Sequence, residues 1–126
     1  MSEEPVFELQ RLIGPELVQQ SLLLRLLTKA GMFDVDGPRN TMYLPISREL
    51  AIKLGVSPYA ETPLSSYTDG LMAQLAKIEA TDDWQAALAG DGAAAQRVSE
   101  QVNGLSDVLK VAITNGDLYL AATADG

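Results

Sequence analysis

The sequence predicts a mainly α-helical domain with a small β-hairpin, and three observations support that fold class. Apolar residues make up 47% of the 126 residues, which is enough to bury one core in a chain of this length. Most of them recur at the spacing of three and four positions that is typical of amphipathic helices. By contrast, residues 33–36 alternate apolar and acidic side chains before a Gly-Pro turn, which favours a hairpin. No repeat or low-complexity linker divides the sequence, so we expect residues 1–126 to form a single domain.

The first helix is expected over residues 15–30. Pro15 suits the first turn of a helix, Lys29 suits its last turn, and Gly31 stops it. Leucines crowd one side of this segment and widen the apolar stripe, so we expect other elements to cover most of its circumference.

The hairpin is expected directly after this helix. Residues 33–36 form its first strand, residues 37–40 supply the turn, and residues 42–44 form a second strand that ends at Pro45. Hairpin strands pair with each other, so both strands are expected to lie side by side.

Two shorter helices and one longer helix are expected in the middle of the chain. Ser47 caps a short helix that stops at Gly55. A longer helix begins near Pro63 and ends at residues 81–83, and a small helix follows at residues 84–88.

The last long helix has the clearest periodic signal in the sequence. Its apolar residues step by four, three, four and three positions, at Val98, Val102, Leu105, Leu109 and Ala112. Asn115 and Gly116 then turn the chain, and residues 117–122 are expected to form a terminal strand or an irregular tail.

The charge of the chain is strongly negative and unevenly distributed. The net charge is −8, with eight acidic and six basic residues before position 64 but nine acidic and three basic residues from there on. A surface of this sign repels phosphate backbones and attracts basic partners, so we expect no direct nucleic-acid binding. The candidate partner-binding residues are acidic residues of the second half: Asp82, Asp83, Asp91 and Asp107.

The sequence contains neither histidine nor cysteine. Imidazole bases, Ser-His-Asp triads, thiolate nucleophiles and zinc sites built from these residues are therefore excluded. The first ten residues lack the basic start and apolar run of a secretory signal, and no stretch is long enough to span a bilayer. We therefore expect a cytoplasmic protein that does not contact membranes.

Three segments follow one another in the order and spacing of a known set of motifs: LQRLIGPEL at 9–17, FDVDGPRNTMYLPIS at 33–47 and SPYAETPLSSYTDGL at 57–71. Together they resemble the AHH family of nucleases. That family belongs to the HNH/endonuclease VII, or His-Me finger, superfamily and is common as the toxic tip of bacterial polymorphic toxins. The resemblance covers residues 7–80 and implies a ββα-like nuclease scaffold, with residues 81–126 as a C-terminal helical extension.

The resemblance also implies where the former active site would lie. The Ala-His-His motif of the family falls on Leu9, Gln10 and Arg11, and the two later histidines fall on Ala60 and Leu64. The family's Glu-Leu, Asn, Leu-Pro and Tyr are kept as Glu16-Leu17, Asn40, Leu44-Pro45 and Tyr67. The degenerate active-site shell is therefore expected on the hairpin and the helix after Pro63: Gln10, Arg11, Asn40, Ala60, Leu64 and Tyr67.

These replacements predict a catalytically inactive protein without a metal or other cofactor. In the family, one histidine is the general base and others hold a divalent metal. An arginine at position 11 accepts no proton near neutral pH, and Ala60 and Leu64 offer a metal no lone pair. Asn40 itself fits the role of a turn residue better than a catalytic role.

An inert copy of a toxin domain with an acidic surface predicts a protein-binding function. The leading hypothesis is an immunity protein or antitoxin that neutralises a related, basic nuclease toxin. It could occlude the nuclease groove or form a dimer through a shared patch, and a homodimer also stays open. The alternatives are a degenerate toxin remnant or regulatory domain without an inhibitory role, and an active nuclease with a carboxylate-only metal site drawn from Asp34, Asp36, Glu16 and Glu61.

Overall fold

The protein is mainly helical with one small antiparallel sheet, which agrees with the predicted fold class at that level. The structure, a computed structural model, describes residues 6–121. In chain order the elements are β1 (Phe7–Arg11), α1 (Pro15–Gln20), α2 (Leu22–Lys29), the 3₁₀ helix η1 (Pro38–Asn40), β2 (Thr41–Pro45), α3 (Arg48–Leu54), α4 (Ser65–Glu79), α5 (Asp82–Leu88) and α6 (Gly92–Thr114).

The predicted pairing of the two strands is wrong. Residues 33–36 form no strand, and β2 pairs instead with β1 near the start of the chain, from Phe7 opposite Pro45 to Arg11 opposite Thr41. The reason is local. The Asp34 carboxylate accepts a hydrogen bond from the Asp36 backbone N–H at 3.0 Å, which bends the segment that was expected to be extended.

The predicted helix over residues 15–30 is two helices that break at Ser21. Ser21 has an extended backbone (φ −109°, ψ 118°), and its hydroxyl accepts a hydrogen bond from the Leu24 N–H. Serine competes for backbone donors in this way, which makes it a good N-cap inside a segment of strong helix formers. The break lets α1 and α2 each direct leucines into the core, namely Leu17, Leu23, Leu24 and Leu27.

The ends of α3 agree with the predicted capping residues, whereas the caps of α5 and α6 were not predicted. The Ser47 hydroxyl caps α3 by accepting from the Leu50 N–H, and Gly55 ends it with a left-handed backbone (φ 71°). The Thr81 hydroxyl caps α5, and the Asp91 carboxylate caps α6.

The segment after α6 is irregular up to residue 121, so the first of its two predicted alternatives, a strand, does not form there; residue 122 lies outside the described residues. This segment folds back onto the body of the protein. Leu120 is fully buried, its N–H donates to the Ser57 hydroxyl at 2.9 Å, and its carbonyl accepts from the Leu64 N–H at 2.8 Å.

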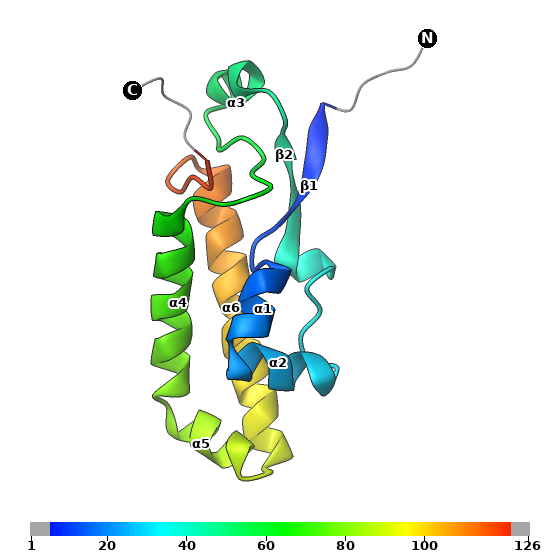
Figure 1. The fold of residues 1–126 in the computed structure, drawn as a ribbon, viewed down its shortest axis with the longest axis vertical. Coiled ribbons are helices and arrows are strands. Elements are labelled where there is room, and N and C mark those ends of the chain that lie inside the picture. The colour runs from blue at the N-terminus through cyan, green and yellow to red at the C-terminus, as the bar shows by residue number, and fades with distance from the viewer. Residues whose placement is uncertain (1–5, 122–126) are drawn as a thin grey trace.

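The arrangement of the elements places the end of β1 beside the beginnings of α1 and α4. In Figure 1, α4 and α6 run alongside each other below the sheet, α1 is followed directly by α2, and the sheet and α3 occupy the opposite end from α5. One core of buried residues connects these elements, including Leu12, Leu24, Leu71, Trp84 and Val102. None of the helices within residues 6–121 has the length and hydropathy needed to cross a bilayer.

Candidate functional site

A cavity of about 280 Å³ lies between the end of β1, the start of α1, residues 59–63 and the first turns of α4. Four of the six residues predicted for the degenerate active-site shell line it: Gln10, Arg11, Ala60 and Tyr67. These residues are up to 57 positions apart in the sequence and come from three different segments. The first and third of the motif segments therefore converge on one cavity, which we call the β1–α4 cavity, whereas no residue of the second segment, 33–47, lines it.

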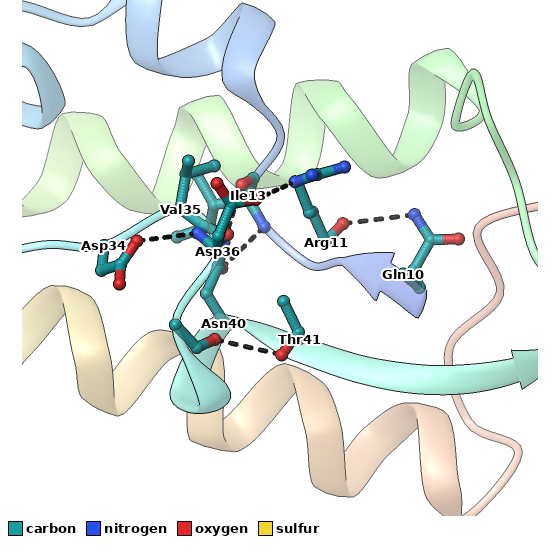
Figure 2. Close-up of polar contacts among 9 residues, drawn as sticks. Gln10, Arg11, Ile13, Asp34, Val35, Asp36, Asn40 and Thr41 are labelled. Carbon is teal, nitrogen blue, oxygen red and sulfur yellow. Dashed lines mark hydrogen bonds and ion pairs between the residues drawn. The ribbon is translucent and has the colours of Figure 1, made fainter. Parts of the chain in front are cut away.

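Gln10 connects the two sides of the β1–α4 cavity. Its side chain is buried on β1, and its amide oxygen accepts a hydrogen bond from the Ala60 backbone N–H at 2.8 Å. Its amide nitrogen donates to the Arg11 carbonyl at 3.2 Å (Figure 2). Both halves of the amide are thus bonded to backbone, so Gln10 fastens residues 57–60 onto the strand.

Arg11 is held at the edge of the β1–α4 cavity by an ion pair. Its Nε donates to the Asp36 carboxylate at 2.6 Å, and both side chains are substantially exposed (Figure 2). The guanidinium contributes positive charge and hydrogen-bond donors but no acceptor, so it cannot serve as a general base. The pairing also occupies one of the two aspartates that the carboxylate-only alternative requires.

Tyr67 anchors α4 to the end of β1. Its side chain is 5% exposed, and its hydroxyl donates to the Leu12 carbonyl at 2.7 Å. Burial raises the pKa of the Tyr67 phenol above its ordinary value, because the phenolate would lie away from water. Tyr67 is therefore a neutral hydrogen-bond donor that links α4 to the end of β1 at the β1–α4 cavity.

Replacing Tyr67 with phenylalanine is expected to cost about 1–2 kcal/mol of unfolding free energy, because the buried Leu12 carbonyl loses its donor. Tyr43→Phe is the matched control, since Tyr43 is 67% exposed. Urea unfolding measures both variants. The wild-type protein should also lose stability as the pH rises above about 10, because a tyrosine ionises there in the unfolded state whereas buried Tyr67 does not. The Tyr67→Phe variant should lack this part of the pH-dependent loss. Equal stability of the two variants would contradict the anchoring role.

Asn40 and Leu64 do not line the β1–α4 cavity. Asn40 is 1% exposed and links the segment after β1 to the segment before η1. Its side-chain oxygen accepts a hydrogen bond from the Ile13 N–H, and its side-chain nitrogen donates to the Ile13 and Val35 carbonyls (Figure 2). Leu64 is the N-cap residue of α4, and its side chain is 39% exposed. The predicted shell is thus divided between four cavity residues, one buried structural amide and one surface residue.

Two carboxylates, those of Glu16 and Glu61, also line the β1–α4 cavity. Both residues are exposed, and neither has a hydrogen bond or ion pair within residues 6–121. That part of the chain contains no group of three or more His, Cys, Asp or Glu side chains placed to hold a metal ion. Because Arg11 is already paired with Asp36, the cavity offers two carboxylates to a ligand, which suits the binding of a basic group.

The four acidic residues predicted to bind a partner lie away from the β1–α4 cavity, and three of them have structural roles. Asp83 pairs with Arg97 at 3.1 Å, Asp91 caps α6, and Asp107 pairs with Arg39 at 2.7 Å. The hydrogen bond from Arg39 lowers the pKa of the Asp107 carboxyl. Asp82, in the first turn of α5, is exposed.

Some cavity residues were not predicted as part of the site. Gln20 and Tyr59 line the β1–α4 cavity; Gln20 belongs to none of the motif segments, and Tyr59 lies in the third segment at a position that was not singled out. Glu16 and Glu61 were predicted only as candidates of the carboxylate-only alternative, and both line the cavity. Compared with family models, curated proteins and solved structures, the chain matches none of them.

Proposed function

We propose that the chain is a catalytically inactive nuclease-like protein that acts by binding another protein, as an immunity protein or antitoxin against a related bacterial nuclease toxin. In this proposal β1, β2 and α4 correspond to a degenerate His-Me finger, and the β1–α4 cavity is its former active site. Such an inhibitor would meet the nuclease in the cytoplasm, where the DNA to be protected lies.

The observation that carries the proposal is the chemistry of the residues that converge on the β1–α4 cavity. At positions where the AHH motifs have imidazoles, Gln10 uses its amide to bond the backbone, and Ala60 is a buried methyl group. Arg11 is paired with Asp36. These side chains stabilise the scaffold and provide neither a general base nor a metal ligand set of the kind that hydrolyses a phosphodiester.

The charge of the chain supports a basic protein as the partner. Within a net charge of −8, Glu16 and Glu61 present at the β1–α4 cavity carboxylates that have no partner among the described residues. A DNA-binding groove is basic, so such a surface attracts it over several ångströms and repels DNA itself. We therefore place the partner's basic residues at the β1–α4 cavity rather than on the aspartates of α5 and α6, three of which already bond within the chain.

Incubation of supercoiled plasmid with the protein and Mg²⁺ or Mn²⁺ is expected to leave the plasmid intact. A His-bearing AHH nuclease domain serves as the active control. Nicking by the protein that disappears in the Glu16→Gln, Glu61→Gln double variant would overturn the inactive assignment and favour a carboxylate-only metal site. Nicking that persists unchanged in this double variant would point to a contaminant, which repurification removes.

Co-expression with a His-bearing AHH nuclease encoded beside this chain's gene is expected to restore growth, and the purified proteins should bind. The double variant Glu16→Lys, Glu61→Lys should associate about tenfold more slowly at low salt, because the attracting charges are reversed. The double variant Asp82→Lys, Glu100→Lys changes the net charge equally at exposed positions outside the cavity and should have a smaller effect. Absence of both rescue and binding would overturn the proposed function.

A further inference from the structure

A second concave surface lies on another side of the molecule, between α4 and α6. It has a volume of about 770 Å³ and extends from the last turn of α4 to the segment after α6. Its lining is largely apolar, with contributions from Ile78, Leu105, Val108 and Leu109. We call it the α4–α6 groove; it shares no lining residue with the β1–α4 cavity.

The α6 side of this groove is an apolar helix face that other elements leave uncovered. Val108 is 65% exposed, and Val111 on the neighbouring face of the same helix is 60% exposed. Gly104 and Ala112 lie one turn before and one turn after Val108, and a Cβ on Gly104 would meet no atom within 4 Å. Small residues that flank an exposed valine allow another helix to approach closely.

The charge of the groove differs from that of the rest of the surface. Among the described residues that line it, Lys77 and Asp117 are the charged ones, so the groove is neutral within a chain of net charge −8. Lys77 lies in the last turn of α4 beside α5, whereas Asp117 follows the end of α6 (Figure 1). The groove therefore has a positive end and a negative end with an apolar middle.

We infer that the α4–α6 groove binds a second copy of this chain, with the two α6 helices antiparallel and the two-fold axis near Val108. In that register Val108 faces itself, and Gly104 of each copy faces Ala112 of the other. The axis also brings Lys77 of each copy towards Asp117 of the other, so that two Lys77–Asp117 pairs form across the interface. Two α4–α6 pairs would then bury their apolar faces in a four-helix arrangement.

A second copy fits this groove better than the basic partner of the proposed function. A basic protein is attracted by unpaired carboxylates, and these lie at the β1–α4 cavity, whereas the groove carries no net charge. A second copy of an acidic chain is repelled from most of the surface but not from a neutral groove. Dimerisation through the groove and binding of a basic partner at the cavity therefore involve different surfaces, and an experiment can contradict either one without the other.

Sedimentation equilibrium of the full chain across the micromolar range is expected to show a monomer–dimer equilibrium. Val108→Glu should weaken dimerisation by more than about tenfold, because it places two carboxylates at the apolar centre of the interface. Ile52→Glu is the matched control, since Ile52 is 62% exposed on α3, and it should leave dimerisation unchanged. A protein that is monomeric at every concentration, or a dimer that Val108→Glu leaves intact, would overturn the inference.

A charge exchange tests the register. Lys77→Glu and Asp117→Lys should each weaken the dimer by about two- to tenfold, because each creates two like-charged contacts across the axis. The double variant Lys77→Glu, Asp117→Lys restores opposite charges and should recover most of the wild-type affinity, more so at low salt. Additive losses in the double variant would overturn the antiparallel register. Circular dichroism confirms that each variant is folded.

Discussion

Replacing Asn40 with alanine is expected to destabilise the protein by about 3–5 kcal/mol, because three buried backbone groups lose their hydrogen-bond partner at once. These groups are the Ile13 N–H and carbonyl and the Val35 carbonyl, at 2.8–2.9 Å from the Asn40 amide. Each buried group left unpaired costs about 1–3 kcal/mol, and the site is too enclosed for water to enter freely. The melting temperature should fall by roughly 10–15 °C.

Thermal and urea unfolding of Asn40→Ala measure this loss, with Asn103→Ala on α6 as the control. Asn103 has the same side chain but no side-chain hydrogen bond within residues 6–121, so its replacement should change stability by less than about 0.5 kcal/mol. Similar stabilities of the two variants would show that the Asn40 hydrogen bonds to Ile13 and Val35 do not stabilise the fold. A selective loss at position 40 supports the structural role of this kept motif residue.

Replacing Gly116 with alanine is expected to cost about 2–4 kcal/mol, the second-largest loss. Gly116 has a left-handed backbone (φ +77°), which disfavours any residue with a Cβ. In addition, the new Cβ would collide with the carbonyl oxygen of Gly55, a backbone atom that cannot rotate away. The turn after α6 and the end of α3 would therefore have to separate.

Gly31→Ala isolates the collision from the backbone effect. Gly31 has nearly the same φ (+73°), but a Cβ there would meet no atom within 4 Å, so only the cost of about 1–2 kcal/mol for the left-handed backbone applies. Differential scanning calorimetry of both variants should show the larger loss for Gly116→Ala. If the two losses are equal, the close approach of the two turns does not contribute to stability.

Helix ends were predictable from the sequence because their signals are local. Ser47 and Gly55 bound α3 through a side-chain cap and a left-handed backbone, and both interactions lie within one turn of the helix. Ser21 was missed although its chemistry is the same, since the leucines on both sides of it suggested one continuous helix. There the local cap and the packing of leucines in two directions prevail over helix propensity.

The strand pairing was not predictable from local patterns. β1 and β2 are about 30 residues apart in the chain. The buried Asn40 side chain, directly before β2, bonds to Ile13 after β1 and to Val35, and so helps to bring the two strands together. The candidate site was predictable only as far as motif positions converge: Gln10, Ala60 and Tyr67 lie together because hydrogen bonds between side chains and backbone groups link their segments. Asn40 lies outside the cavity because its buried amide is positioned by hydrogen bonds to the backbone of Ile13 and Val35.

The burial of Leu120 has a consequence for biosynthesis. Its N–H and carbonyl bond to Ser57, which follows α3, and to Leu64, which precedes α4, and its side chain belongs to the buried core. On the ribosome, α4 is synthesised before residue 120, so the core that Leu120 completes stays open to solvent until this residue has left the exit tunnel. Full cooperative folding therefore waits until translation has passed this residue, and a nascent chain stalled earlier is exposed to chaperones and proteases.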